Sequence, residues 1–266
     1  MSASMRTLSI MLACIILSTP GIIGCKKEKE DAKQKYILEK IIIPPPNMIF
    51  AALQSSGTIN WKTIITYNDE TNYTTFEKIA LNLGIRVADG FVAIMAENRN
   101  DMTRMGKAIK ILAKKIGIGD QILQKTGEIE IDEKMGTWKK NEAKFNEIYS
   151  NIINELEQRQ DYEVSYFCNL GAWLEALYIA SKSLTEKYDP QMAENLRQKG
   201  LVDVFLEGFD MLSDETKENP LVQAIKEKLT AIGPLLDFPR GKSLSRENAK
   251  KLFEITTDLK AEIEKI

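Results

Sequence analysis

The sequence predicts an all-α protein folded as a compact multi-helix bundle. Apolar residues recur at the 3.6-residue spacing of an amphipathic helix along most of the chain after residue 70. Asp-Pro, Asn-Pro and glycine signals divide this region into segments of ordinary helix length. No set of regularly alternating strands interrupts the pattern. We therefore expect one helical domain over residues 47–266.

The first expected elements are a short helix and one long helix. The short helix covers Met48–Gln54, whereas the β-branched segment Trp61–Tyr67 fits either a strand or a helix. The long helix is expected from Asn72 or Thr74 to about Glu97. Its apolar face carries Phe76, Ile79, Leu83, Val87, Phe91 and Ile94. Gly84 and Gly90 within it indicate close approach by another helix, because glycine costs roughly 1 kcal/mol against alanine there.

The middle of the chain predicts further helices. They run from a cap at Asp101 to Gly117 or Gly119, around Ile122 and Leu123 as far as Gly127, from Trp138 to about Gln160, and from Tyr162 to Tyr188. The lysine-rich face between Lys107 and Lys115 is expected to face solvent.

The last third of the chain carries the clearest helix starts. Asp189-Pro190 and Asn219-Pro220 each place a capping side chain before a proline at the first helical position. The resulting helices are expected to stop at Gly200 and at Gly233-Pro234, with Val202–Leu212 helical between them. A final helix is expected from Ser245 to about Lys265, with Leu252, Ile255, Leu259 and Ile263 on its apolar face and solvated glutamates and lysines elsewhere.

One short sequence occurs twice. Asn82-Leu83-Gly84 returns 87 residues later as Asn169-Leu170-Gly171, and both copies lie in long helices. The repeat favours two related helical hairpin units whose helices pack side by side through their glycines. The alternative, which remains open, is that two apolar helices share this short sequence by chance.

Polar residues beside this repeat form the candidate ligand cleft. Asn82, Arg86 and Asp89 follow one another along one helix face. The nearest counterparts in the second copy are Asn169, Trp173 and Glu175. If the helices pair, these six side chains converge on a cleft for a polar ligand. The alternative is structural: Arg86 and Asp89 pair at i,i+3, and the asparagines satisfy backbone groups near the glycines.

Composition excludes several kinds of chemistry. The chain has no histidine, which removes imidazole bases and histidine-ligated metal sites, and it has no glycine-rich phosphate-binding motif. We assign no catalytic residue, metal or cofactor. The formal net charge of −2 argues against nucleic acid as a partner. Cys168 lies in an apolar helical stretch and is expected to be buried.

The beginning of the chain has the parts of an export signal. Arg6 precedes the apolar run Leu8–Leu17, and Pro20 and Gly21 follow it. The run is too short for a membrane span, which takes roughly 20 apolar residues. It leads to Ile22-Ile23-Gly24-Cys25, which resembles the lipobox of bacterial lipoproteins. The helices that carry the repeat also resemble those of uncharacterised helical lipoproteins, a resemblance that implies no activity.

The lipobox resemblance implies that residues 1–24 are removed and that Cys25 carries diacylglycerol and an N-linked acyl chain. Two or more chains anchor a protein stably. The alternative is a signal peptide cut elsewhere, with Cys25 an ordinary residue. Residues 25–46 then form a charged tether that ends in Pro44-Pro45-Pro46. Lys26 is not the aspartate that retains enteric lipoproteins, which favours the outer membrane, facing the periplasm or the surface, over the inner membrane.

These observations predict a membrane-anchored, non-catalytic envelope lipoprotein that acts as a binding or assembly module. Its expected partners are the membrane, through the lipid on Cys25, and an envelope protein or a small ligand. Two alternatives stay open. One is a carboxylate-based hydrolase of envelope polymer that uses Asp89 and Glu175, which requires carboxyls roughly 5–10 Å apart. The other is a small-ligand sensor or carrier.

Overall fold

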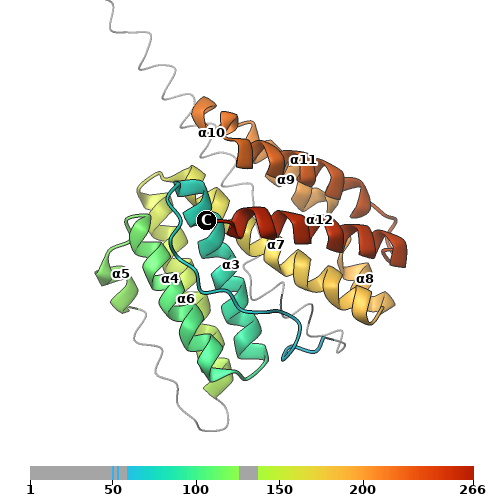
Figure 1. Ribbon diagram of the computed structural model, residues 1–266, viewed down its shortest axis with the longest axis horizontal. Coiled ribbons are helices and arrows are strands. Elements are labelled where there is room, and N and C mark those ends of the chain that lie inside the picture. The colour runs from blue at the N-terminus through green and yellow to red at the C-terminus, as the bar shows by residue number, and fades with distance from the viewer. Residues whose placement is uncertain (1–49, 51–52, 54–58, 126–136) are drawn as a thin grey trace, which may run out of the picture.

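The computed structural model describes Phe50, Leu53 and residues 59–125 and 137–266, and these residues form a multi-helix bundle (Figure 1). They contain no strand, which confirms the all-α class. Trp61–Tyr67 is neither strand nor regular helix, and it begins with a turn in which the Thr63 N–H donates to the Asn60 carbonyl at 3.1 Å. The signal segment, Cys25 and the tether lie outside the described residues, as does most of the expected helix over Met48–Gln54.

The helices follow the expected order closely. They are α3 (Phe76–Met95), α4 (Arg99–Lys115), α5 (Asp120–Lys125), α6 (Thr137–Gln158), α7 (Tyr162–Glu186), α8 (Pro190–Asn195), α9 (Lys199–Phe209), α10 (Asp214–Glu218), α11 (Pro220–Leu235) and α12 (Arg246–Glu264). α3 lies at the centre, where it packs against α4, α6, α7 and α12. α11 packs on α9 and α12 at the other side of the molecule (Figure 1).

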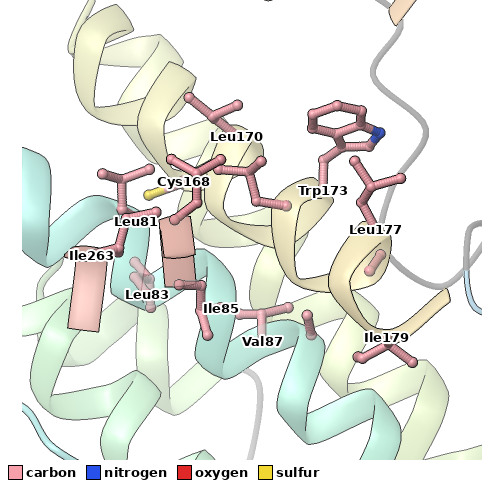
Figure 2. Packing of buried hydrophobic residues seen from close by; sticks show 14 of the residues in the cluster. Leu81, Leu83, Ile85, Val87, Cys168, Leu170, Trp173, Leu177, Ile179 and Ile263 are labelled. Carbon is pink, nitrogen blue, oxygen red and sulfur yellow. The ribbon is translucent and has the colours of Figure 1, made fainter. Parts of the chain in front are cut away.

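The two helices that carry the repeated sequence approach each other through their glycines. A Cβ atom on Gly84 would lie 2.0 Å from the Cys168 carbonyl oxygen, and a Cβ atom on Gly171 would lie 2.1 Å from the Leu81 carbonyl oxygen. Each glycine therefore contacts the residue just before the other copy of the repeat. Apolar side chains surround this crossing (Figure 2). The expected packing of the two helices through their glycines is confirmed.

α3 and α7 run in the same direction. Near their starts, the rings of Phe76 and Phe167 pack edge to face at 6.1 Å. Further along, Asp89 of α3 and Glu175 of α7 belong to one buried set of ion pairs that runs through Arg86, Glu264 and Lys260. Residues near the start of α3 therefore meet residues near the start of α7, and later residues meet later ones. The chain between the two helices, which includes α4 and α6, leads back to the end of the bundle at which α3 begins, and α7 begins there too.

Four local details differ from expectation. α4 is capped by Asn98, whose Oδ1 accepts from the Asp101 N–H at 3.2 Å, so Asp101 lies in the first turn. Gly200 does not end a helix but lies in the first turn of α9. α11 continues through Pro234 to Leu235; the proline cannot donate to the carbonyl four residues earlier, and the helix ends one residue after it. α10 was not expected, since its five residues carry no apolar periodicity.

Candidate functional site

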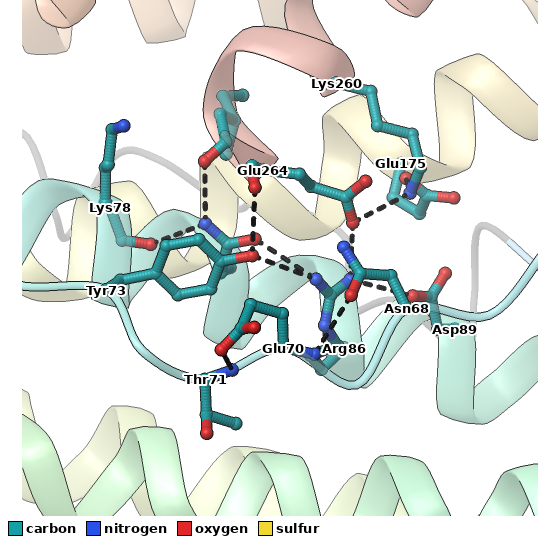
Figure 3. Close-up of polar contacts among 12 residues, drawn as sticks. Asn68, Glu70, Thr71, Tyr73, Lys78, Arg86, Asp89, Glu175, Lys260 and Glu264 are labelled. Atoms are coloured by element: carbon teal, nitrogen blue, oxygen red, sulfur yellow. Dashed lines mark hydrogen bonds and ion pairs between the residues drawn. The ribbon is translucent and has the colours of Figure 1, made fainter. Parts of the chain in front are cut away.

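The C-terminal end of α12 lies across α3, and side chains of α3 and its approach satisfy the final carbonyl groups of α12. A helix end leaves such carbonyls without internal partners. Asn82 Nδ2 donates to Ile263 O at 3.0 Å, and the Tyr73 hydroxyl donates to Glu264 O at 3.4 Å (Figure 3). Lys78 Nζ donates to Lys265 O at 2.5 Å. α12 therefore ends on α3 instead of on a glycine cap.

Five charged side chains meet under this contact, and we call them the charge cluster: Arg86, Asp89, Glu175, Lys260 and Glu264. Arg86 is 0% exposed, and its NH1 group donates to Asp89 Oδ2 at 3.1 Å and to Glu264 Oε1 at 2.6 Å. Its NH2 group donates to Asn82 Oδ1 at 3.3 Å and to the Tyr73 hydroxyl at 3.4 Å. One guanidinium thus joins the middle of α3 to the end of α12.

Lys260 joins α12 to α7 within the charge cluster. Its Nζ lies 2.5 Å from Glu175 Oε2 and 3.5 Å from Glu264 Oε1. The same ammonium lies 5.5 Å from the centre of the Tyr178 ring, within range of a cation–π contact. Glu175 is 1% exposed, so Lys260 is the cation that balances a fully buried carboxyl. Figure 3 shows these side chains converging from the three helices.

Burial and neighbouring charges shift the titration of the cluster. Burial, and then the Asp89 charge, outweigh Lys260 and raise the pKa of Glu175 to about 8. Burial likewise raises the pKa of Asp89 despite Lys260 and Arg86. Burial would raise the pKa of Glu264, but Lys260 and Arg86 lower it. Burial would lower the pKa values of both cations, yet the carboxylates raise them, so Arg86 and Lys260 stay charged.

Four of the six candidate cleft residues come together. Asn82, Arg86, Asp89 and Glu175 lie in or beside the charge cluster. Asn169 instead accepts from the Tyr149 hydroxyl on α6 at 2.6 Å. The four are buried and covered by α12, so they line the surface on which the protein's own last helix packs.

Trp173 faces a different neighbour. Its Nε1 donates to Gln198 Oε1 at 3.0 Å, and its ring lies 5.1 Å from the Phe205 ring on α9. Trp173 stands 87 residues after Arg86, so the two occupy equivalent positions in the repeated helices. One helix presents a guanidinium to α12, and the other presents an indole to α9.

The structural alternatives for this region are met. Arg86 and Asp89 pair at i,i+3. Asn82 Nδ2 donates to Lys78 O at 2.8 Å, and Asn169 Nδ2 donates to Ser165 O at 3.0 Å. Both asparagines therefore satisfy the carbonyl four residues earlier in their own helix.

Sequence reasoning missed Lys260, Glu264 and Tyr73. The acidic and basic residues of the last helix were expected to face solvent, which is wrong for Lys260 and Glu264, whose side chains are each 15% exposed. The available signal was position, because each directly follows an apolar-face residue, Leu259 or Ile263. The lysine-rich face between Lys107 and Lys115 does face solvent, as expected.

Other features bear on ligand binding. Within the described residues, no group of histidine, cysteine, aspartate and glutamate side chains could hold a metal ion.

A groove of about 420 Å³ lies away from the charge cluster, on α9, α10 and α11. It is lined by Phe209, Lys217, Val222, Gln223, Lys226, Glu227 and Thr230. Cys168 is buried, as expected, and burial raises the pKa of its thiol well above the ordinary value.

Comparison with known proteins gives no match: no protein-family model, curated protein or solved structure is significantly similar to this chain. Among the residues described here, none of the helices combines the length and apolar character that crossing a membrane requires.

Proposed function

We propose that this chain is a lipid-anchored, non-catalytic protein of the bacterial envelope whose helical domain binds other envelope components. The observation that carries the proposal is Ile22-Ile23-Gly24-Cys25, placed after an apolar run and before a charged tether. Cys25 holds the lipid, and residues 26–46 separate the membrane from the helical domain. The outer membrane is the proposed site, because Lys26 follows the cysteine where retained enteric lipoproteins carry aspartate.

The geometry of the charge cluster argues against hydrolysis by Asp89 and Glu175. A hydrolase would need Asp89 and Glu175 open to a polymer substrate. Both are 1% exposed, Arg86 pairs with Asp89, and Lys260 pairs with Glu175. These contacts give the two carboxyls a structural role, which is to hold α12 against α3 and α7.

Metabolic labelling with an alkyne analogue of palmitate tests the anchor. We expect the full chain, expressed in a bacterium, to incorporate the label and to fractionate with membranes. Cys25→Ala should abolish both results. Cys14→Ala is the matched control and should keep the label, because Cys14 lies in the segment that is removed. Label that persists on Cys25→Ala, or its absence from the wild type, would refute the anchor.

Crosslinking in intact cells tests the binding role. We expect the full chain to capture the same envelope protein in repeated experiments, and Cys25→Ala to lose that product because it leaves the membrane. Failure of the anchored wild type to form any specific product with an envelope protein would count against a binding module, whatever the outcome of the labelling.

A further inference from the structure

We propose that Asp89 and Glu175 share one proton, and that loss of this proton to solvent loosens the seating of α12 on α3 and α7. The shared proton would make the charge cluster a pH-sensitive latch on the last helix. The inference concerns the helical domain alone and stands apart from the proposed anchor.

The first support is a pair of oxygens without donors. Asp89 Oδ1 and Glu175 Oε1 are both buried, and neither accepts a hydrogen bond from any of the described residues. A buried acceptor without a donor destabilises the folded state. The two carboxyls belong to the same buried cluster, linked through Arg86, Glu264 and Lys260, and each changes the pKa of the other. One proton between them turns two unsatisfied acceptors into a donor and an acceptor.

The second support is the charge count. The cluster contains three carboxyls but only two cations, Arg86 and Lys260. The groups that face it from the segment before α3, Tyr67 and Tyr73, are phenols whose pKa values burial raises, and so is Tyr178 on α7. With all carboxyls ionised, the buried cluster would carry one excess negative charge. Sharing a proton makes it neutral, which a low-dielectric site favours.

The direction of the pH effect follows from proton linkage. Once α12 is released, Asp89 and Glu175 meet water and titrate at roughly pH 4. In the seated state the pair keeps its proton until the pKa of Glu175, about 8. Between these values the seated state binds one proton more than the open state, so seating weakens as pH rises. Glu264, with a lowered pKa, acts oppositely, but only below about pH 4.5.

Release of α12 would uncover a defined surface. Asn82 and Arg86, both 0% exposed, would lose Ile263 O and Glu264 as partners. That surface fits a helix end of the same kind, with a lysine and a glutamate four residues apart before its last carbonyls.

Infrared spectroscopy tests the shared proton in the wild type. We expect the C=O band of a protonated carboxylic acid at about pH 6.5 and its loss above about pH 9. Glu175→Gln and Asp89→Asn should each remove the band at pH 6.5. Glu254→Gln is the matched control, because Glu254 is an exposed carboxylate of α12. A wild type without this band at pH 6.5 would overturn the proposal.

Hydrogen exchange tests the latch. We expect the protection factors of α12 amides, corrected for intrinsic exchange, to fall by up to about tenfold per pH unit between pH 5 and 8. Glu254→Gln should behave like the wild type. Glu175→Gln keeps an acceptor for Lys260 and a donor for Asp89, so its α12 protection should be nearly independent of pH. Wild-type protection that stays constant over this range would refute the latch even if the proton is present.

Discussion

Asn82 and Asn169 show how one residue type can take the same local role and two different distant ones. Each side-chain amide donates to the carbonyl four residues earlier. Their oxygens differ, since Asn82 accepts from Arg86 and Asn169 accepts from Tyr149. The local role and the Arg86–Asp89 pair are predictable from spacing. The distant partners are not, because they depend on which helix packs against each face.

Gly84→Ala should destabilise the protein strongly. The new methyl would lie 2.0 Å from the Cys168 carbonyl oxygen and 2.6 Å from the Ala172 nitrogen, both on the backbone of α7. Backbone atoms cannot rotate away, so α3 and α7 must separate, at a cost of roughly 2–3 kcal/mol. Denaturant unfolding at constant m-value measures the loss.

Gly200→Ala is the control for this substitution. Gly200 is also helical, but a methyl there meets nothing within 4 Å. Its stability should stay the same or rise by up to about 1 kcal/mol through helix propensity. Equal stability of the two variants would show that the glycine contact does not limit the approach of α3 and α7.

At the scale of elements, α12 is defined at its two ends in different ways. Its start is local: Ser245 Oγ accepts from the Asn248 N–H at 3.1 Å. Its end is tertiary, because donors on and before α3 satisfy its last carbonyls. The start could therefore be predicted from the sequence, whereas the structural role of the end could not.

Ser245→Ala should loosen the beginning of α12. Removing a serine cap costs about 1 kcal/mol, which corresponds to about fivefold in an opening equilibrium. Hydrogen exchange should show this loss of protection in the first turns of α12, with α4 unchanged. Ser245→Asp keeps an accepting oxygen at the cap and should retain protection. Equal loss in both variants would assign the effect to something other than the cap.

The same distinction explains which helix ends were predicted well. Asp189 and Asn219 cap α8 and α11 as expected, since a side-chain acceptor followed by proline acts within one turn. Gly200 and Pro234 suggested stops, but Gly200 lies in the first turn of α9 and Pro234 lies within α11, one residue before its end. The fold class and most elements were therefore predictable. The charge cluster was only half predictable, because Lys260 and Glu264 turn inward through the way α12 packs.

At the scale of the whole molecule, α3 and α7 cross at the centre and between them contact α4, α6, α8 and α12. Cys168 sits at this crossing, 0% exposed, with its carbonyl oxygen against Gly84. Its thiol is held in the unreactive protonated form by burial, which raises its pKa. Exposure of this one atom therefore requires the helices packed around it to separate.

Thiol labelling should report that event. In a Cys14→Ser, Cys25→Ser chain, Cys168 is the only cysteine. We expect almost no reaction with iodoacetamide in native buffer and rapid reaction above the denaturant midpoint, as followed by intact mass. Adding Gly84→Ala should shift the labelling midpoint to lower denaturant. Fast labelling of the parent chain in native buffer would contradict the closed crossing.

The reciprocal contacts of Gly84 and Gly171 also bear on how the chain can evolve. Two helices with matching glycine contacts resemble the two subunits of a symmetric dimer, except that each helix is encoded separately. A mutation in a homodimer alters both sides of the interface, whereas a mutation here alters one helix alone. Arg86 and Trp173, 87 positions apart, show that the two sides differ, one helix being charged and the other aromatic at the same place. The two glycines have matching contacts, whereas the residues beside them have different ones.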